Sequence, residues 1–192
     1  ILVNNAGVMD LFQSVADVDN DTWRRVLSVN LDGPMFAMRR AVPLMLTQGG
    51  GAIVNTSSSG ANYATVDLPS YAVAKAGMHA LTREVAATYG RDNIRCNAVV
   101  PGAVLTPRGR ATLSPEMFEL FATHTSLPRL AFAQDIANVV VFLASDLAGM
   151  VTGLAVPVDG GMTDKLPYWL PKMRASRGER FDATTFKDTA SA

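Results

Sequence analysis

Short apolar runs alternate along the chain with longer stretches in which apolar residues recur at helical spacing. Strands are expected at four of these runs, at residues 1–3, 52–56, 93–100 and 154–158. Helices are expected in four stretches: from about Asp21, from about Pro69 to Tyr89, in a short segment opening at Ser114, and from about Ala133 to Leu147. Strands that alternate with long helices predict parallel strands joined by crossovers.

Residues that favour helix ends and turns set the expected limits of these elements. Asn20 or Asp21 is expected to cap the first helix, and Gly90 is expected to end the second long one. Pro34 and Pro43 are expected to bend or split the first helical stretch, because proline lacks the main-chain N–H.

The strand-like runs are apolar at successive positions, as an open α/β sheet covered on both faces requires. In such sheets ligands bind beyond the carboxyl ends of the strands. Three loops follow strands directly, at Asn4–Gly7, Ser57–Ser59 and Pro101-Gly102. We therefore expect these loops to gather at one edge of the sheet and to hold the functional site.

Composition narrows the function classes. The 192 residues include 17 basic and 17 acidic side chains, so the basic excess of a nucleic-acid or membrane-surface protein is missing. No apolar run approaches the roughly 20 residues that a membrane-spanning helix needs. One cysteine and two histidines without ligand spacing predict no metal site and are typical of a reducing, cytoplasmic location. The chain opens in mid-pattern at Ile1, so we expect it to be the C-terminal part of a longer protein.

Tyr71 and Lys75 are four residues apart on a predicted helix, so their side chains share one face. A phenol is a poor acid or base at neutral pH, but a nearby ammonium favours the phenolate. We therefore expect Lys75 to lower the pKa of Tyr71 and the pair to transfer protons. A tyrosine packed against a lysine stem is the structural alternative.

Two further side chains are candidates for the same site. Ser58 follows a strand and could donate a hydrogen bond to a substrate oxygen, or could serve only as a turn residue. A serine hydrolase is disfavoured because the chain has no Gly-x-Ser-x-Gly turn. Asn30 lies inside a helical pattern that it suits poorly, which predicts a local bend that exposes a carbonyl or holds a water; a solvent-facing asparagine is the alternative.

Together these segments resemble the short-chain dehydrogenase/reductase family in its common single-domain branch. The resemblance spans residues 1–163. It is carried by Asn4–Gly7, Asn30, Asn55–Ser58 with Tyr71–Lys75, Asn97–Gly102 with Thr106, Leu143–Asp146 with Thr152-Gly153, and Val158–Gly161. It implies a Rossmann-like, doubly wound parallel sheet of which residues 1–163 form the C-terminal part. Residues 103–130 would form a lid over the substrate, and residues 164–192 a C-terminal extension.

The resemblance also implies an activity, an NAD(P)-dependent interconversion of an alcohol and a ketone. Tyr71 would exchange the proton, Ser58 would orient the substrate oxygen, and Lys75 would assist Tyr71 and bind the nicotinamide ribose. Asn30 would hold a water that links Lys75 to bulk solvent. Contacts to the NAD or NADP cofactor would come from Tyr71 and Lys75 and from Asn5, Ala6, Gly7, Pro101, Gly102, Val104 and Thr106. A homo-oligomer, a dimer or a tetramer, is also implied.

The chain departs from the family pattern at one point. The Gly-rich turn that holds the cofactor pyrophosphate does not occur in the sequence, and neither do the strands expected around it. The choice between NAD and NADP is therefore not encoded in these residues. Two alternatives stay open, a non-catalytic nucleotide-binding sensor or scaffold and a fragment that is inactive as given.

Overall fold

The computed structural model describes residues 1–10, 12–112 and 114–165, so the expected C-terminal extension lies almost wholly outside the described residues. The helices are α1 (Asn20–Leu27), α2 (Gly33–Gln48), α3 (Pro69–Tyr89), α4 (Pro107–Thr112), α5 (Pro115–His124) and α6 (Ala133–Ala144). The strands are β1 (Leu2–Asn4), β2 (Gly51–Thr56), β3 (Ile94–Pro101), β4 (Val104–Leu105), β5 (Ala131–Phe132) and β6 (Ala155–Val158).

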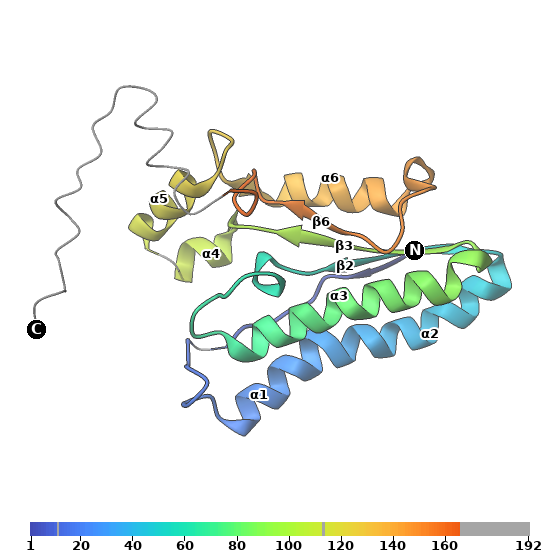
Figure 1. The fold of residues 1–192 in the computed structure, drawn as a ribbon, viewed down its shortest axis with the longest axis horizontal. Helices are drawn as coiled ribbons and strands as arrows, with labels where there is room; N and C mark the ends of the chain where they lie inside the picture. The colour runs from blue at the N-terminus through green and yellow to red at the C-terminus, as the bar shows by residue number, and fades with distance from the viewer. Residues whose placement is uncertain (11, 113, 166–192) are drawn as a thin grey trace, which may run out of the picture.

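The central sheet has the order β1-β2-β3-β6, and every neighbouring pair is parallel. The predicted parallel α/β sheet is therefore confirmed. Helices α1, α2 and α3 lie on one side of the sheet and α6 lies on the other (Figure 1). Helices α4 and α5 lie beyond the carboxyl ends of the strands, together with the small β4-β5 sheet. Between β3 and α5 the chain therefore contains a short strand and a short helix.

Apolar side chains fill both faces of the sheet. Ile53 packs with residues of α2 and α3, whereas its neighbour Val54 packs with Leu143 of α6. Successive strand residues point to opposite faces, so a strand that is covered on both sides needs apolar residues at every position. This packing explains the uninterrupted apolar runs in the sequence.

The first helical stretch is interrupted where Asn30 lies. A π-helical turn at Ser28–Asp32 separates α1 from α2, so the predicted local bend is present. Pro34 follows the turn directly, and Pro43 lies inside α2 without ending it. The cap of α1 is Asp19, one residue before the two that we expected, and its carboxylate accepts from two main-chain N–H groups of the first turn.

Helix α3 has the limits that the sequence predicts, Pro69–Tyr89. Pro69 occupies the first turn, where a missing N–H is tolerated. Gly90 stays in the right-handed region with φ −62°, and a short 3-10 turn continues the chain to Asp92. The residue that reverses the chain is Asn93, with φ 61°, because asparagine also adopts the left-handed conformation readily. The expectation that Gly90 ends α3 is confirmed, because Gly90 is the C-cap of the helix, although its backbone is not left-handed.

Candidate active site

Helix α3 brings Tyr71 and Lys75 onto one face, one turn apart. The Lys75 ammonium lies 5.6 Å from the centroid of the Tyr71 ring. Lys75 is only 4% exposed, and Tyr71 is half-buried. The two side chains therefore contact each other in a partly desolvated position at the carboxyl end of the sheet.

The Lys75 ammonium is held by the end of β2. Its Nζ donates to the main-chain carbonyl of Thr56 over 2.6 Å. Burial lowers the pKa of Lys75 to about 8, because desolvation penalises the charged form. The chain thus places a cation whose charge is readily lost next to the phenol.

The Tyr71 phenol keeps its proton more strongly than the sequence predicts. Burial raises the pKa of Tyr71, and the Ser58 hydroxyl, which hydrogen-bonds the phenol, offsets part of this effect. The expected net lowering of the Tyr71 pKa was wrong for the structure described here, because desolvation of the phenolate outweighs the contributions that favour it, and the hydrogen bond of Lys75 is made to Thr56.

The serines after β2 differ in their surroundings. Ser57 is buried, and its hydroxyl donates to the main-chain carbonyl of Lys75 over 3.3 Å. Ser58 is half-buried, caps the short turn Ser59–Ala61 by accepting from the N–H of Gly60, and hydrogen-bonds Tyr71. Ser57 therefore has a structural contact, whereas Ser58 lies beside the phenol.

Asn30 connects the π-helical turn to the loop after β1. Its Nδ2 donates to the carbonyls of Val8 and Val26, and its Oδ1 accepts from the N–H of Val8. The residue is fully buried, so the solvent-facing alternative is wrong. The bend at Asn30 serves to tie this loop in place.

Gly7 lies where Asn30 and Lys75 approach the loop. A Cβ added at Gly7 would lie 2.8 Å from Asn30 Oδ1 and 3.7 Å from Lys75 Nζ. Contacts below 3.0 Å are not tolerated without a shift of the neighbour, and three hydrogen bonds fix the Asn30 amide. The absence of a side chain at Gly7 thus keeps the loop close to the residues of α3.

A cavity of about 580 Å³ opens between the carboxyl ends of the strands and α6. Among the expected cofactor contacts, it is lined by Asn5, Pro101, Val104 and Thr106. Neither Tyr71 nor Lys75 lines it. The expected contact Gly102 packs instead against Asp159, since a Cβ there would lie 2.7 Å from the Asp159 Cβ. The expected contacts Ala6 and Gly7 are exposed on the loop after β1.

The sequence reasoning missed two contributors to this cavity. Thr56 lines it and donates from its hydroxyl to Asn5 Oδ1 over 3.0 Å. Apolar residues of α6 form the opposite wall, including Ile136, Val140 and Val141. Val141 is 67% exposed. An apolar residue outside the buried stripe of α6 is the sequence feature that could have indicated this wall of the cavity.

Buried polar side chains hold the elements of the site in register. Asn4 at the end of β1 donates to Asn55 of β2 over 2.8 Å, and Asn55 donates to Thr82 of α3 over 3.0 Å. Asn97 of β3 bonds two main-chain groups of the turn before β6. Hydrogen-bonded polar groups inside a core fix geometry, because an alternative packing would leave them unsatisfied.

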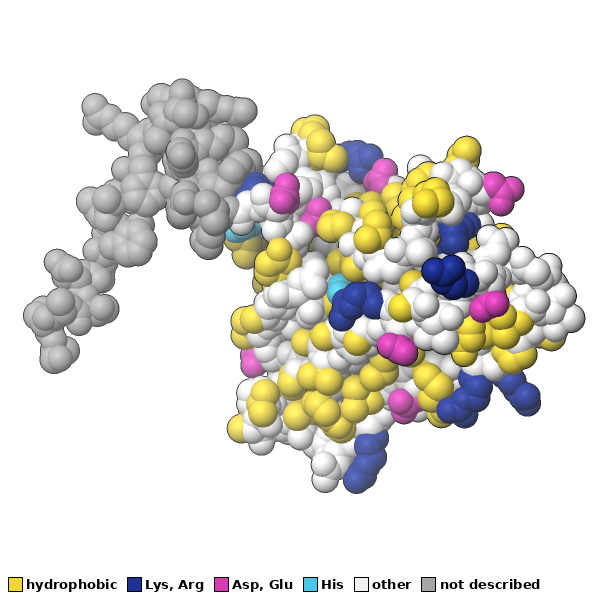
Figure 2. Space-filling view, turned by 45° about the vertical axis from the view of Figure 1, so that its right-hand side comes forward, with side chains coloured by type: hydrophobic (Ala, Val, Ile, Leu, Met, Phe, Trp, Pro, Cys, Tyr) yellow, Lys and Arg dark blue, Asp and Glu magenta, His cyan; other side chains and the backbone are white. Residues whose placement is uncertain are grey.

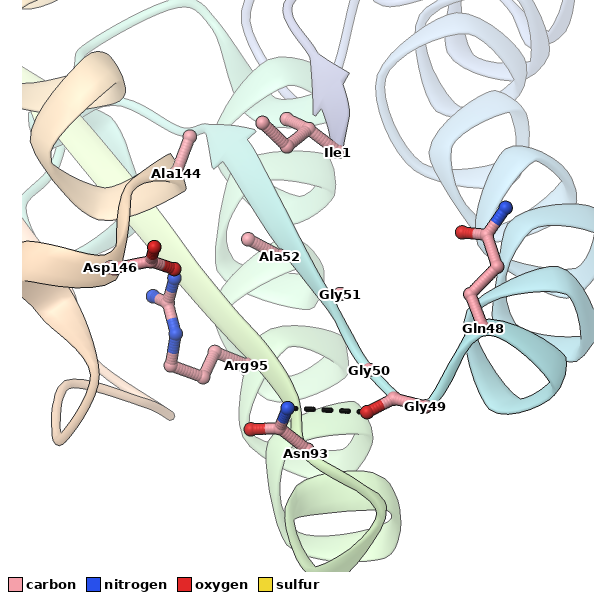
Figure 3. A pocket seen from close by; sticks show the side chains of 10 residues that line it. All are labelled: Ile1, Gln48, Gly49, Gly50, Gly51, Ala52, Asn93, Arg95, Ala144 and Asp146. Atoms are coloured by element: carbon pink, nitrogen blue, oxygen red, sulfur yellow. Dashed lines mark hydrogen bonds between the residues drawn. The ribbon is translucent and has the colours of Figure 1, made fainter.

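A second cavity, of about 360 Å³, lies at the opposite, amino ends of the strands (Figure 3). Its residues include Asn93, whose side chain donates to the Gly49 carbonyl, and Arg95. The Arg95 guanidinium donates to the carbonyls of Leu143 and Ser145, so it holds the end of α6. None of the candidate catalytic residues lies there.

The described residues contain no group of three or more His, Cys, Asp or Glu side chains placed to hold a metal ion. Within the same part of the chain, no helix combines the length and the apolar character that crossing a bilayer requires.

Comparison with known proteins supports the resemblance that the motifs carry. A family model described as enoyl-(acyl carrier protein) reductase matches residues 1–163. The 7alpha-hydroxysteroid dehydrogenase of Bacteroides fragilis is 38% identical over 165 residues, which are 85% of this chain and 64% of that protein.

Two solved structures have a similar fold. An oxidoreductase of the short-chain dehydrogenase/reductase family from Burkholderia thailandensis superposes with a TM-score of 0.81 at 32% identity, over 94% of this chain and 70% of its own. A gluconate 5-dehydrogenase from Burkholderia cenocepacia, in complex with NADP and tartrate, superposes with a TM-score of 0.81 at 28% identity, over 86% of this chain and 65% of its own. The chain spans 61% to 65% of the length of the first three curated relatives that it matches.

Proposed function

We propose that this chain, which belongs to the short-chain dehydrogenase/reductase family, carries the catalytic residues of an NAD(P)-dependent oxidoreductase that interconverts an alcohol and a ketone. The proposal rests on one observation, the contact of Tyr71 with both Ser58 and Lys75 at the carboxyl end of the sheet. The complex of a similar gluconate 5-dehydrogenase with NADP supports the choice of cofactor class.

The residues present fit a nicotinamide cofactor. The 580 Å³ cavity at the strand ends offers polar groups of Asn5, Thr56 and Thr106 beside apolar walls. Because Gly7 has no side chain, the loop after β1 lies close to the Lys75 ammonium. We propose that Asn5, Ala6, Gly7, Pro101, Gly102, Val104 and Thr106 contact the cofactor, together with Tyr71 and Lys75. When bound, the cofactor supplies or accepts the hydride of the reaction.

Tyr71 exchanges the proton in this mechanism. Because burial raises the pKa of Tyr71, its phenol is protonated at neutral pH and is ready to donate to the oxygen of a ketone as that oxygen gains negative charge. Ser58, which hydrogen-bonds the phenol, is placed to orient the same oxygen. Lys75 then stabilises the phenolate that remains, since opposite charges in a partly buried site attract strongly.

Asn30 is the fourth catalytic candidate, and its proposed role is to support Lys75. A Cβ built at Gly7 would lie 2.8 Å from Asn30 Oδ1 and 3.7 Å from Lys75 Nζ, so both side chains face the same part of the loop. We propose that a water held by the bend at Asn30 links Lys75 to bulk solvent, which would return protons to the site after each turnover.

Further features of the proposal concern the whole protein. We propose that residues 1–163 act as one catalytic unit with a lid at residues 103–130, in a cytoplasmic homo-oligomer, either a dimer or a tetramer. Hydrophobic side chains gather in the lower part of the face drawn in Figure 2, at the level of α1–α3. Phe36 and Leu44 of α2 are 51% and 64% exposed, which supports burial of this helix in an assembly.

Replacement of Tyr71 with phenylalanine in the full-length protein tests the proposed function. Nicotinamide absorbance would be followed with a panel of ketones, sugars and steroids, and kcat for Tyr71→Phe should fall by a factor of about 100 or more. Tyr63→Phe is the matched control, because Tyr63 is 54% exposed and its hydroxyl donates to the Thr163 carbonyl. Near-normal turnover by Tyr71→Phe would refute the proton-transfer role. Tight cofactor binding without any turnover by the wild-type protein would favour a sensor or scaffold.

A further inference from the structure

The amino end of α3 has no cap from its own sequence. The first N–H groups of a helix lack partners within the helix, and a Ser, Thr, Asp or Asn side chain just before the helix usually accepts from them. Leu68 occupies that position in α3 and makes no such bond. Helices α1 and α5, in contrast, are capped locally by Asp19 and Ser114.

Asp10 takes over this role from a distant part of the chain. Its Oδ2 accepts from the N–H of Ser70 over 2.9 Å and from the N–H of Tyr71 over 3.4 Å. Because Pro69 has no N–H, these are the first two main-chain donors of the helix. The negative carboxylate also faces the positive end of the helix dipole. A residue in the loop after β1 thus binds the main chain of the proposed proton donor directly.

Both partners of this contact are buried. Asp10 is 3% exposed and Ser70 is fully buried. The second oxygen of Asp10, Oδ1, is also buried and has no hydrogen-bond partner in the described part of the chain. Leaving a carboxylate oxygen unsatisfied costs free energy, which offsets part of what the two N–H bonds to Oδ2 contribute to stability. A role in placing Tyr71 accounts for its presence.

The loop that contains Asp10 also contacts the other parts of the site. Asn5 lines the cavity at the strand ends, and Val8 makes two hydrogen bonds with Asn30. The loop therefore connects the proposed cofactor contacts with the first turn of α3. We propose that Asp10 is a positioning residue, which fixes the first turn of α3 so that the Tyr71 phenol meets Ser58. This inference rests on the proposed function.

The test compares Asp10→Ala and Asp10→Asn with Asp19→Ala in the full-length protein. Asp19 has the same residue type and also caps a helix, but it is exposed and its carboxylate bonds the first turn of α1 instead of α3. We expect Asp10→Ala to lower kcat about tenfold or more with little change in the KM for substrate or cofactor, because small displacements of a reacting group are costly. Asp10→Asn keeps an acceptor oxygen and should restore most of kcat, and Asp19→Ala should leave kcat unchanged.

A second measurement does not depend on activity. Amide hydrogen exchange at Ser70 and Tyr71, followed by NMR, should be faster in Asp10→Ala than in wild type and unchanged in Asp19→Ala. If the wild-type protein turns over no alcohol or ketone, the proposed function fails and this exchange alone decides whether Asp10 holds the helix end. Unchanged kcat in Asp10→Ala, or unchanged exchange at both amides, would overturn the inference.

Discussion

Replacement of Lys75 with methionine should stabilise the folded protein while it removes activity. Lys75 is buried, and its ammonium has one hydrogen bond, to the Thr56 carbonyl. Methionine has a similar length and carries no charge, so it can occupy the same space. A residue that costs stability but remains at a functional position is typical of an active site.

The magnitude follows from the pKa of Lys75, which burial lowers from 10.5 to about 8. At about 1.4 kcal/mol for each pKa unit, keeping the ammonium charged in the folded state costs roughly 3 kcal/mol. The substitution also leaves the Thr56 carbonyl without this partner, a loss of about 1 kcal/mol. At pH 7 the free energy of unfolding of Lys75→Met should therefore exceed that of wild type by about 2 kcal/mol.

The sign of the pH dependence is determined by whether the folded or the unfolded state binds more protons at Lys75. Below pH 8 the lysine is charged in both the folded and the unfolded state, so the full cost is present. Between pH 8 and 10.5 the unfolded chain binds more protons than the folded one, so the stability contributed by this site rises with pH. The charge cost falls to about 1 kcal/mol near pH 10, which the lost Thr56 hydrogen bond offsets, so the advantage of Lys75→Met should disappear there.

Urea denaturation of the full-length protein without cofactor, at pH 7 and at pH 10, measures both quantities. Comparing Lys75→Met with wild type at each pH provides an internal control, because every titrating group other than Lys75 is the same in both proteins. The reasoning is wrong if Lys75→Met is less stable than wild type at pH 7, or if its advantage does not depend on pH.

Two other substitutions test the packing of the site by the same urea method. Gly7→Ala should lower the free energy of unfolding by about 1–3 kcal/mol, because its Cβ would meet Asn30 Oδ1 at 2.8 Å; Gly90→Ala, which has open space and φ −62°, should not destabilise and serves as its control. Equal stability of the two variants would contradict the close approach at Gly7. Asn97→Ala should cost about 1–3 kcal/mol for each of the two main-chain groups that it leaves unsatisfied. A cost near zero would show that water replaces the Asn97 amide.

Local patterns were sufficient for much of the fold and for the central pair of the site. The period of the apolar residues distinguished the strands from the helices, and apolar residues at successive strand positions indicated a sheet covered on both faces. The four-residue spacing of Tyr71 and Lys75 determined that they share a face, because a helix repeats every 3.6 residues. The bend at Asn30 was also predictable, since asparagine competes with the helix for hydrogen bonds.

Properties that depend on residues distant in sequence were decided only by the tertiary structure. The direction in which the Tyr71 pKa shifts depends on burial of the phenol and on which group accepts the hydrogen bond of Lys75. Neither follows from a helical pattern. The wall of the cavity formed by α6 and the cap supplied to α3 by Asp10 join segments that are tens of residues apart. Sequence periodicity specifies which face of an element is apolar, but only the packed chain specifies which groups meet across that face and how far water is excluded from them.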